Sequence, residues 1–314
     1  MNLHSDRAAF ELIIDEVANS SGVRRDVLEK DYYVTLMLKE LADRPNQGYA
    51  YFKGGTALYK ALRSIRRFSE DIDLTVYVED CPTPSQAKKR LENASLKFNC
   101  LPKGETEENR RGSITCLYVY DSLYQLDKDD TLQRFGKVKV EATSFTVSEP
   151  TQGIEIAPHL YELCGEDRRK ILRENYGVQP FIVQTISLER IFIDKVFAAE
   201  FYYVRNAYFD VAKHIYDLTV LMSNDKIKTF LADKDDVARI VALKRKEELN
   251  RKGGVDALLA IRDFSCFDGL KDNKNFAVEF ERMQRTYVLI QSDKIALSEA
   301  LEAIQNLRRL LSWL

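Results

Sequence analysis

The residues best suited to chemistry lie between positions 53 and 78, in the stretch KGGTALYKALRSIRRFSEDIDLTVYV. Within it, Asp71 and Asp73 stand two residues apart at the start of a predicted strand. Side chains at that spacing point to one face, where two carboxylates repel each other unless a cation lies between them. Mg²⁺ prefers hard carboxylate oxygens and keeps further positions for substrate phosphates. The pair therefore predicts a divalent metal site.

A glycine turn precedes the acidic pair in the sequence. Gly54, Gly55 and Thr56 open a predicted helix, and Ser69 lies two residues before Asp71. Glycine allows the backbone to approach a phosphate closely, and the first amides of a helix favour an anion. We therefore expect this turn and Ser69 to bind a triphosphate beside the metal.

A simpler interpretation of Asp71 and Asp73 is that they keep an exposed strand soluble. An Asp-x-Asp pattern alone has many chance matches. Aspartate is disfavoured in strands, however, and two aspartates beside a glycine turn form a more demanding pattern. The combination favours the metal site.

The elements that position these residues follow from hydrophobic periodicity. Residues 72–78 alternate strictly between apolar and polar side chains, which is typical of a strand with one buried face. Residues 136–143 alternate in the same way, and Glu141 lies off the apolar face of that strand. Further strands are predicted at about 49–52 and 114–120, and helices at about 54–63 and 85–98.

The chain as a whole is predicted to have three parts. Residues 1–48 form two amphipathic helices that pack on the core, and residues 49–180 form an α/β domain. Helical patterns dominate after Pro180, so residues 181–314 are predicted to be a helical domain. The expected fold class is α/β (α+β) with a mixed sheet.

Two charged residues in the helical part form a second candidate. Lys195 falls within the apolar stripe of a helix at 187–203, and a lysine there needs water or an anionic partner. Asp217 lies at the edge of the stripe of the next helix, at 208–222. If the two helices fold back about Asn206, Lys195 and Asp217 lie level with each other. The pattern leaves open whether this pair is structural or functional.

Composition limits the class of protein. Of the 314 residues, 45% are hydrophobic and 31% are charged, which favours a globular fold with a sizeable core. The net charge of −2 argues against a protein that is basic all over, although a local basic face would allow nucleic-acid binding. The five scattered cysteines favour reduced thiols over a zinc site. With no signal peptide or membrane segment in view, we expect a cytoplasmic protein without membrane contacts.

The glycine turn followed by Ser69, Asp71 and Asp73 resembles the signature of the DNA polymerase β-like nucleotidyltransferase superfamily. Several segments together resemble the AbiEii/AbiGii toxin family, which includes the mycobacterial MenT toxins. These segments are EKDYYVT (29–35), FKGGTAL (52–58), RFSEDIDL (67–74), ERIFIDK (189–195) and HIYDL (214–218).

The resemblance implies a polymerase β-like core with a mixed sheet, followed by a helical domain that completes the active site. It implies that Asp71, Asp73 and a third carboxylate, for which Glu141 is the candidate, hold Mg²⁺ or Mn²⁺. It also implies that Lys195 contacts the phosphates of a nucleoside triphosphate (NTP) substrate and that Asp217 completes the site.

The activity implied by the resemblance is nucleotidyl transfer to RNA, notably to the 3′ end of tRNA, by the toxin of a toxin–antitoxin or abortive-infection system. A cognate antitoxin, often a winged-helix AbiEi-like protein, is implied as a partner. Two alternatives stay open: a nucleotidyltransferase that modifies a protein or a small molecule, and a nucleotide- or RNA-binding module without catalysis. Sequence alone gives no role to Lys30, Asp31 or His214.

Overall fold

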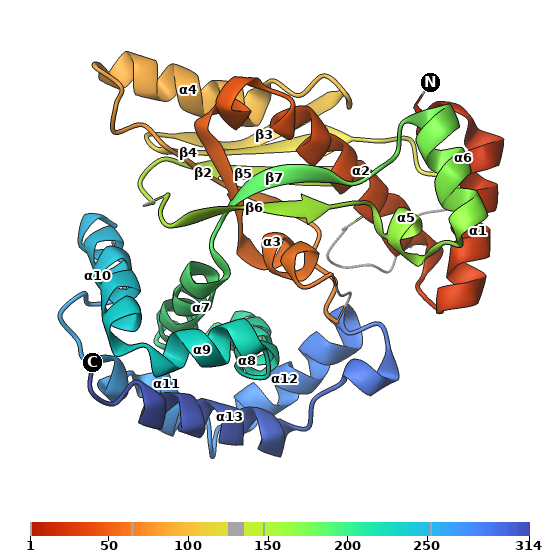
Figure 1. Ribbon diagram of the computed structural model, residues 1–314. Helices are drawn as coiled ribbons and strands as arrows, with labels where there is room; N and C mark the ends of the chain where they lie inside the picture. Colours follow the sequence, from red (N-terminus) through yellow and green to blue (C-terminus); the bar gives the residue numbers. More distant parts are fainter. Residues whose placement is uncertain (1, 64–65, 125–134, 147, 252) are drawn as a thin grey trace. The chain divides into compact units, whose positions relative to one another are not determined.

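The structure is a computed structural model, and it describes residues 2–63, 66–124, 135–146, 148–251 and 253–314 (Figure 1). The chain divides into two compact units, Met1–Thr185 and Ile186–Leu314. The first unit combines a sheet with helices, and the second is built from helices.

The strands of the first unit are β1 (Ala50–Lys53), β2 (Ile72–Val76), β3 (Lys103–Arg110), β4 (Ser113–Val119), β5 (Lys137–Thr143), β6 (Thr151–Ile156) and β7 (Phe181–Ile186). In the described part of the chain they form one seven-stranded sheet in the order β3-β4-β5-β2-β1-β7-β6. The sheet is mixed, because β2 pairs in parallel with β5 and antiparallel with β1.

The centre of this sheet forms where the sequence alternates. Ile72, Leu74 and Val76 of β2 are buried, as are Val138 and Val140 of β5. Alternation gives each strand one apolar face for the core and leaves the intervening polar side chains on the other face. The strands predicted at 72–78 and 136–143 are confirmed as β2 and β5, although β2 ends at Val76, two residues earlier than predicted.

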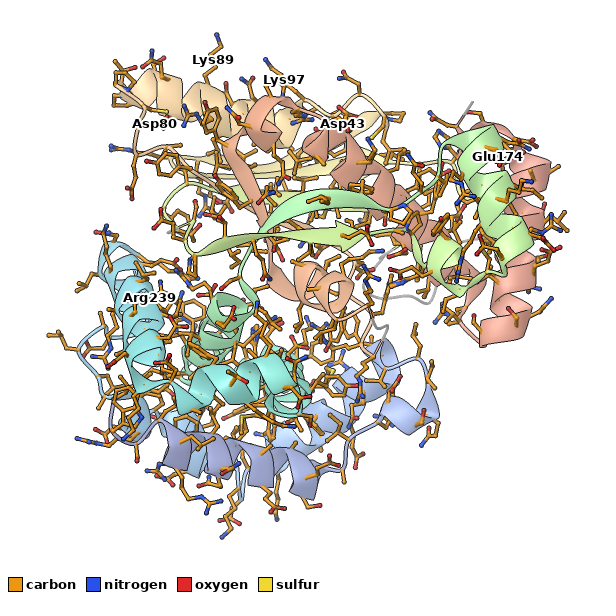
Figure 2. The ribbon with its side chains drawn as sticks, in the orientation of Figure 1. Asp43, Asp80, Lys89, Lys97, Glu174 and Arg239 are labelled. Atoms are coloured by element: carbon orange, nitrogen blue, oxygen red, sulfur yellow. The ribbon has the colours of Figure 1, made fainter. Side chains whose placement is uncertain are left out.

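The helices of the first unit are α1 (Arg7–Ser21), α2 (Arg25–Ala42), α3 (Gly54–Ala61), α4 (Pro84–Leu96), α5 (His159–Leu163) and α6 (Glu166–Tyr176). Helices α2 and α4 lie on one face of the sheet, and α3 lies on the other (Figure 1). Lys89 of α4 points away from the sheet (Figure 2), so the outer face of this helix is hydrated.

The helices of the second unit are α7 (Leu188–Tyr203), α8 (Tyr208–Met222), α9 (Asp225–Ala232), α10 (Lys234–Asn250), α11 (Ser265–Gly269), α12 (Lys274–Tyr287) and α13 (Leu297–Leu310). Helix α8 packs against α7, α12 and α13 and forms the centre of this unit. Short 3₁₀ turns occur at Leu3–Ser5, Pro45–Tyr49, Ile261–Asp263 and Gln291–Asp293.

The predicted α/β class with a mixed sheet is confirmed, but three strands were not predicted. β3 has the sequence KGETEENR, which lacks apolar alternation because it is a charged edge strand. β6 lies at the opposite edge, and β7 directly follows Pro180, where only helices were expected. Within the described ranges, no helix has both the length and the apolar character that crossing a membrane requires.

Candidate active site

Three adjacent strands bring charged residues to one level of the sheet. Asp73 of β2 pairs with Glu141 of the parallel strand β5, and on its other side it pairs with Lys53 of β1. Directly paired residues share a face of the sheet. Asp73 and Glu141 therefore lie side by side, as the predicted metal site requires, although they are 68 positions apart in the sequence.

The glycine turn touches both ends of the acidic segment. Gly54 has a φ of 78°, and a Cβ atom added there would collide with the Asp73 carboxylate. A Cβ atom on Gly55 would lie 2.7 Å from the Ser69 hydroxyl oxygen. The Thr56 hydroxyl donates to the Ser69 hydroxyl at 3.0 Å. The structure thus joins the residues that were predicted to bind phosphate to one of those predicted to bind metal.

Gly54→Ala will weaken binding of a Mg²⁺–NTP complex by about tenfold, since the new methyl group must displace the Asp73 carboxylate. Gly22→Ala is the matched control. Gly22 has a similar φ of 75°, but a Cβ atom added there meets no atom within 4 Å. Both variants incur the cost of a left-handed alanine, about 1–2 kcal/mol. Titration with a fluorescent NTP measures the difference, and equal binding by the two variants contradicts the prediction.

Lys139 is a site residue that sequence reasoning missed. Its ammonium nitrogen lies 3.3 Å from Asp71 Oδ2 and 2.5 Å from Glu141 Oε1. Burial by itself lowers the pKa of Lys139, but the charges of Asp71 and Glu141 outweigh that effect and raise it above its usual value. Lys139 is therefore charged at neutral pH.

The carboxylates have the chemistry that Mg²⁺ requires. Mg²⁺ commonly uses one or two protein carboxylates together with substrate phosphates, and Asp71 and Asp73 can supply these. Among the residues that the structure describes, no group of three or more His, Cys, Asp or Glu side chains is arranged around a common metal position. Asp71 and Glu141 contact Lys139 instead.

A buried ion pair lies next to the residues that were predicted to bind phosphate. The Asp31 carboxylate of α2 accepts from Lys60 of α3 at 2.7 Å and from the His159 amide at 2.6 Å. Asp31, Lys60 and His159 line one small cavity together with Thr56 and Ser69. The pair therefore fixes α3, whose first turn carries the glycines, against α2.

The pKa of Asp31 is the balance of opposing effects. Burial raises it, but the facing charges of His159 and Lys60 outweigh burial and hold it below its usual value. A carboxylate whose pKa is lower in the folded state than in the unfolded state stabilises the fold fully at pH values above its unfolded pKa, near 3.9 for aspartate. This contribution is lost as the pH falls through the pKa of the folded state.

Asp31→Asn will lower the free energy of unfolding at pH 7 by about 3 kcal/mol, because it leaves Lys60 charged and buried without its carboxylate. The difference between wild type and variant will shrink below about pH 4 as Asp31 becomes protonated. Urea denaturation at pH 7 and pH 3 measures it. Asp43→Asn, which removes an exposed pair with Lys39, will change stability by less than about 1 kcal/mol. A constant Asp31→Asn effect at both pH values contradicts the assignment.

In the second unit, the predicted ion pair between Lys195 and Asp217 is confirmed. Lys195 Nζ of α7 lies 2.9 Å from Asp217 Oδ2 of α8. Asn206, with a φ of 56°, lies in the turn that reverses the chain between the two helices. Lys195 is 7% exposed and Asp217 is fully buried, so both charges are largely removed from water.

Other polar residues of the second unit have identifiable structural roles. The His214 ring stacks on Tyr202, with ring centroids 5.3 Å apart. Arg190 of α7, which is 1% exposed, contacts Glu247 of α10 at 2.5 Å and so joins these helices. Sequence reasoning missed Arg190 because it lies next to apolar residues in the segment ERIFIDK (189–195).

The predicted site residues form two groups. Those in the first unit are Gly54, Gly55, Thr56, Ser69, Asp71, Asp73 and Glu141, and those in the second unit are Lys195 and Asp217.

The sequence matches the model of a protein family, and the fold is similar to the solved structure of a toxin. The family described as "Nucleotidyl transferase AbiEii toxin, Type IV TA system" matches residues 36–305, a range that contains every predicted site residue. The structure of MenT4, a nucleotidyltransferase toxin from Mycobacterium tuberculosis H37Rv, aligns with a TM-score of 0.60 at 16% sequence identity. The alignment covers 96% of this chain and 90% of that chain, and at this identity it concerns the fold. No curated protein matches the sequence.

Proposed function

Because the chain belongs to the AbiEii nucleotidyltransferase toxin family of type IV toxin–antitoxin systems, we propose that it transfers a nucleoside monophosphate from an NTP to RNA. The proposed acceptor is the 3′ end of tRNA, where an added nucleotide blocks aminoacylation and hence translation. The observation that carries the proposal is that the Asp73 carboxylate occupies the space in which a Cβ atom on Gly54 would lie. It supports the proposal because a backbone that can approach phosphate closely lies beside an oxygen that we propose to bind the metal.

The proposed metal site consists of Asp71, Asp73 and Glu141, which would hold Mg²⁺ or Mn²⁺. Bound there, the ion would offset the negative charge of the triphosphate and favour ionisation of the acceptor hydroxyl. Pairing between β2 and β5 supports this assignment, because it sets Asp73 beside Glu141.

The other predicted residues bind and orient the nucleotide. The turn of Gly54, Gly55 and Thr56 and the Ser69 hydroxyl would bind the phosphates. Lys195 would offset the charge that develops on the phosphates during transfer, and Asp217 would hold the Lys195 ammonium in place.

The proposed reaction is an in-line displacement at the α-phosphorus. The oxygen of the terminal ribose hydroxyl forms a bond to the α-phosphorus, and the bond from that phosphorus to the bridging oxygen breaks. Pyrophosphate leaves with the electron pair, and the hydroxyl proton passes to Glu141. The product is RNA extended by one nucleotide.

The family also implies an antitoxin partner. We propose a winged-helix AbiEi-like protein encoded beside this chain. The test is co-expression: growth arrest by the chain alone and growth in the presence of that protein support the proposal, and arrest in both cases contradicts it.

The activity is tested by incubating the protein with Mg²⁺, each of the four α-³²P NTPs in turn, and total tRNA. The expected result is label in tRNA, with no label when the tRNA has been oxidised with periodate to destroy its 3′ diol. Label on added protein or on a small molecule would favour the first alternative. Saturable NTP binding without transfer to any acceptor would favour a binding module.

A further inference from the structure

We propose that Lys139 is an internal counter-ion, which holds Asp71 and Glu141 in place before a metal binds. An incoming divalent cation must displace the Lys139 ammonium from these carboxylates. The inference rests on the metal site of the proposed function. It adds a residue that controls how tightly this site takes up its ion.

The position of Lys139 follows from strand pairing. Lys139 and Glu141 are two residues apart on β5, so their side chains share a face. The parallel register places Ile72 of β2 beside Val140 and Asp73 beside Glu141. This register brings Lys139 next to Asp71, and the ammonium contacts both carboxylates, at 3.3 Å and 2.5 Å.

A divalent ion shared by these carboxylates would compete with the ammonium for the same oxygens. Asp71 and Glu141 each direct one oxygen at Lys139. Two cations that close to each other repel strongly, so a Mg²⁺ ion that takes either carboxylate must push the ammonium aside. In the absence of metal, Lys139 provides the positive charge that keeps the acidic residues together.

The alternative is an ordinary ion pair at a half-exposed site, which contributes little. The side chain of Lys139 is 32% exposed, and those of Asp71 and Glu141 are 36% and 40% exposed. What distinguishes Lys139 from such a pair is that it contacts two carboxylates assigned to one metal site. An ordinary pair would not affect metal affinity specifically.

Lys137 offers a matched control. It lies on the same strand and the same face, two residues earlier, and is also half-buried. None of the carboxylates in the described part of the chain forms an ion pair with its side chain. Lys137→Met therefore makes the same change in net charge without removing a competitor from the metal site.

The experiment measures Mn²⁺ binding to the full chain without nucleotide, by the loss of the free Mn²⁺ electron paramagnetic resonance signal. Lys139→Met is expected to bind Mn²⁺ about tenfold more tightly than wild type. Lys137→Met and the charge-conserving Lys139→Arg are expected to stay within about twofold of wild type. Lys139→Gln gives the same test if the methionine variant folds poorly by circular dichroism.

Unchanged or weaker Mn²⁺ binding by Lys139→Met and Lys139→Gln would overturn the inference. Equal tightening in Lys137→Met would also overturn it, because the effect would then come from net charge alone. No NTP or RNA is present, so the result is independent of whether transfer occurs. Tighter Mn²⁺ binding in a chain that transfers no nucleotide would support the counter-ion and contradict the proposed reaction.

Discussion

Asp73→Asn will reduce nucleotidyl transfer by about a thousandfold while leaving the fold intact. Asparagine has the shape of aspartate, so β2 can keep its pairing with β1 and β5. The substitution removes the negative charge and one anionic oxygen at the point where the glycine turn meets the sheet. Mg²⁺ binds neutral amide oxygens less well than carboxylates, so the loss affects catalysis more than stability.

The measurement is incorporation of α-³²P nucleotide into tRNA at saturating Mg²⁺ and NTP, together with a thermal denaturation curve. Asp167→Asn is the control, because Asp167 is an exposed residue at the start of α6. It should transfer at the wild-type rate. If Asp73→Asn melts like wild type and transfers nucleotide at more than about a tenth of the wild-type rate, Asp73 does not belong to the proposed site.

Lys195→Met will lower the free energy of unfolding by about 3–5 kcal/mol and will also abolish transfer. The stability effect arises because Asp217 is fully buried, and the substitution removes the ammonium 2.9 Å from its carboxylate. Lys213→Met is the comparison. Lys213 pairs with Asp210 at the surface of the same unit, so its loss should cost less than about 1 kcal/mol.

A double variant separates the structural role of this pair from its role in catalysis. Lys195→Met combined with Asp217→Leu replaces both charges with apolar groups, which is often close to neutral for stability. We expect urea denaturation to show most of the lost stability restored. Transfer should stay absent, because no ammonium is left for the phosphates. Recovery of transfer in the double variant would mean that the pair serves only to hold the helices together.

The parts of the site that could be predicted have local signals. The glycine turn and the Asp71–Asp73 pair lie within 20 residues of each other in the sequence. The turn indicates a backbone that can approach phosphate closely, and the pair indicates two carboxylates on one face of a strand. The pairing of Lys195 with Asp217 was predictable because a helical hairpin fixes the level of residues at equal distances from its turn. Helices and alternating strands were predicted for the same reason, since their periodicity is contained within each segment.

Sequence could not supply what depends on pairing between distant segments. The contact of Lys139 with Asp71 requires the register between β2 and β5, which hydrophobic alternation does not determine. A lysine on the same face as Glu141, two residues away, was the available signal. Edge strand β3 was missed because none of its residues is buried and its sequence is mostly charged, so that no apolar face marks it.

Helix α2 has a consequence for how the first unit folds. Glu29, Lys30 and Asp31 are consecutive and buried, and each is bonded to a different element: the loop after β4, strand β5 and helix α3. A partly folded chain that lacked any one of these elements would bury an ionised group without its partner, at a cost of several kcal/mol. Intermediates that dock α2 early are therefore penalised. Species that have α2 in place and the sheet incomplete should therefore be poorly populated when the first unit folds.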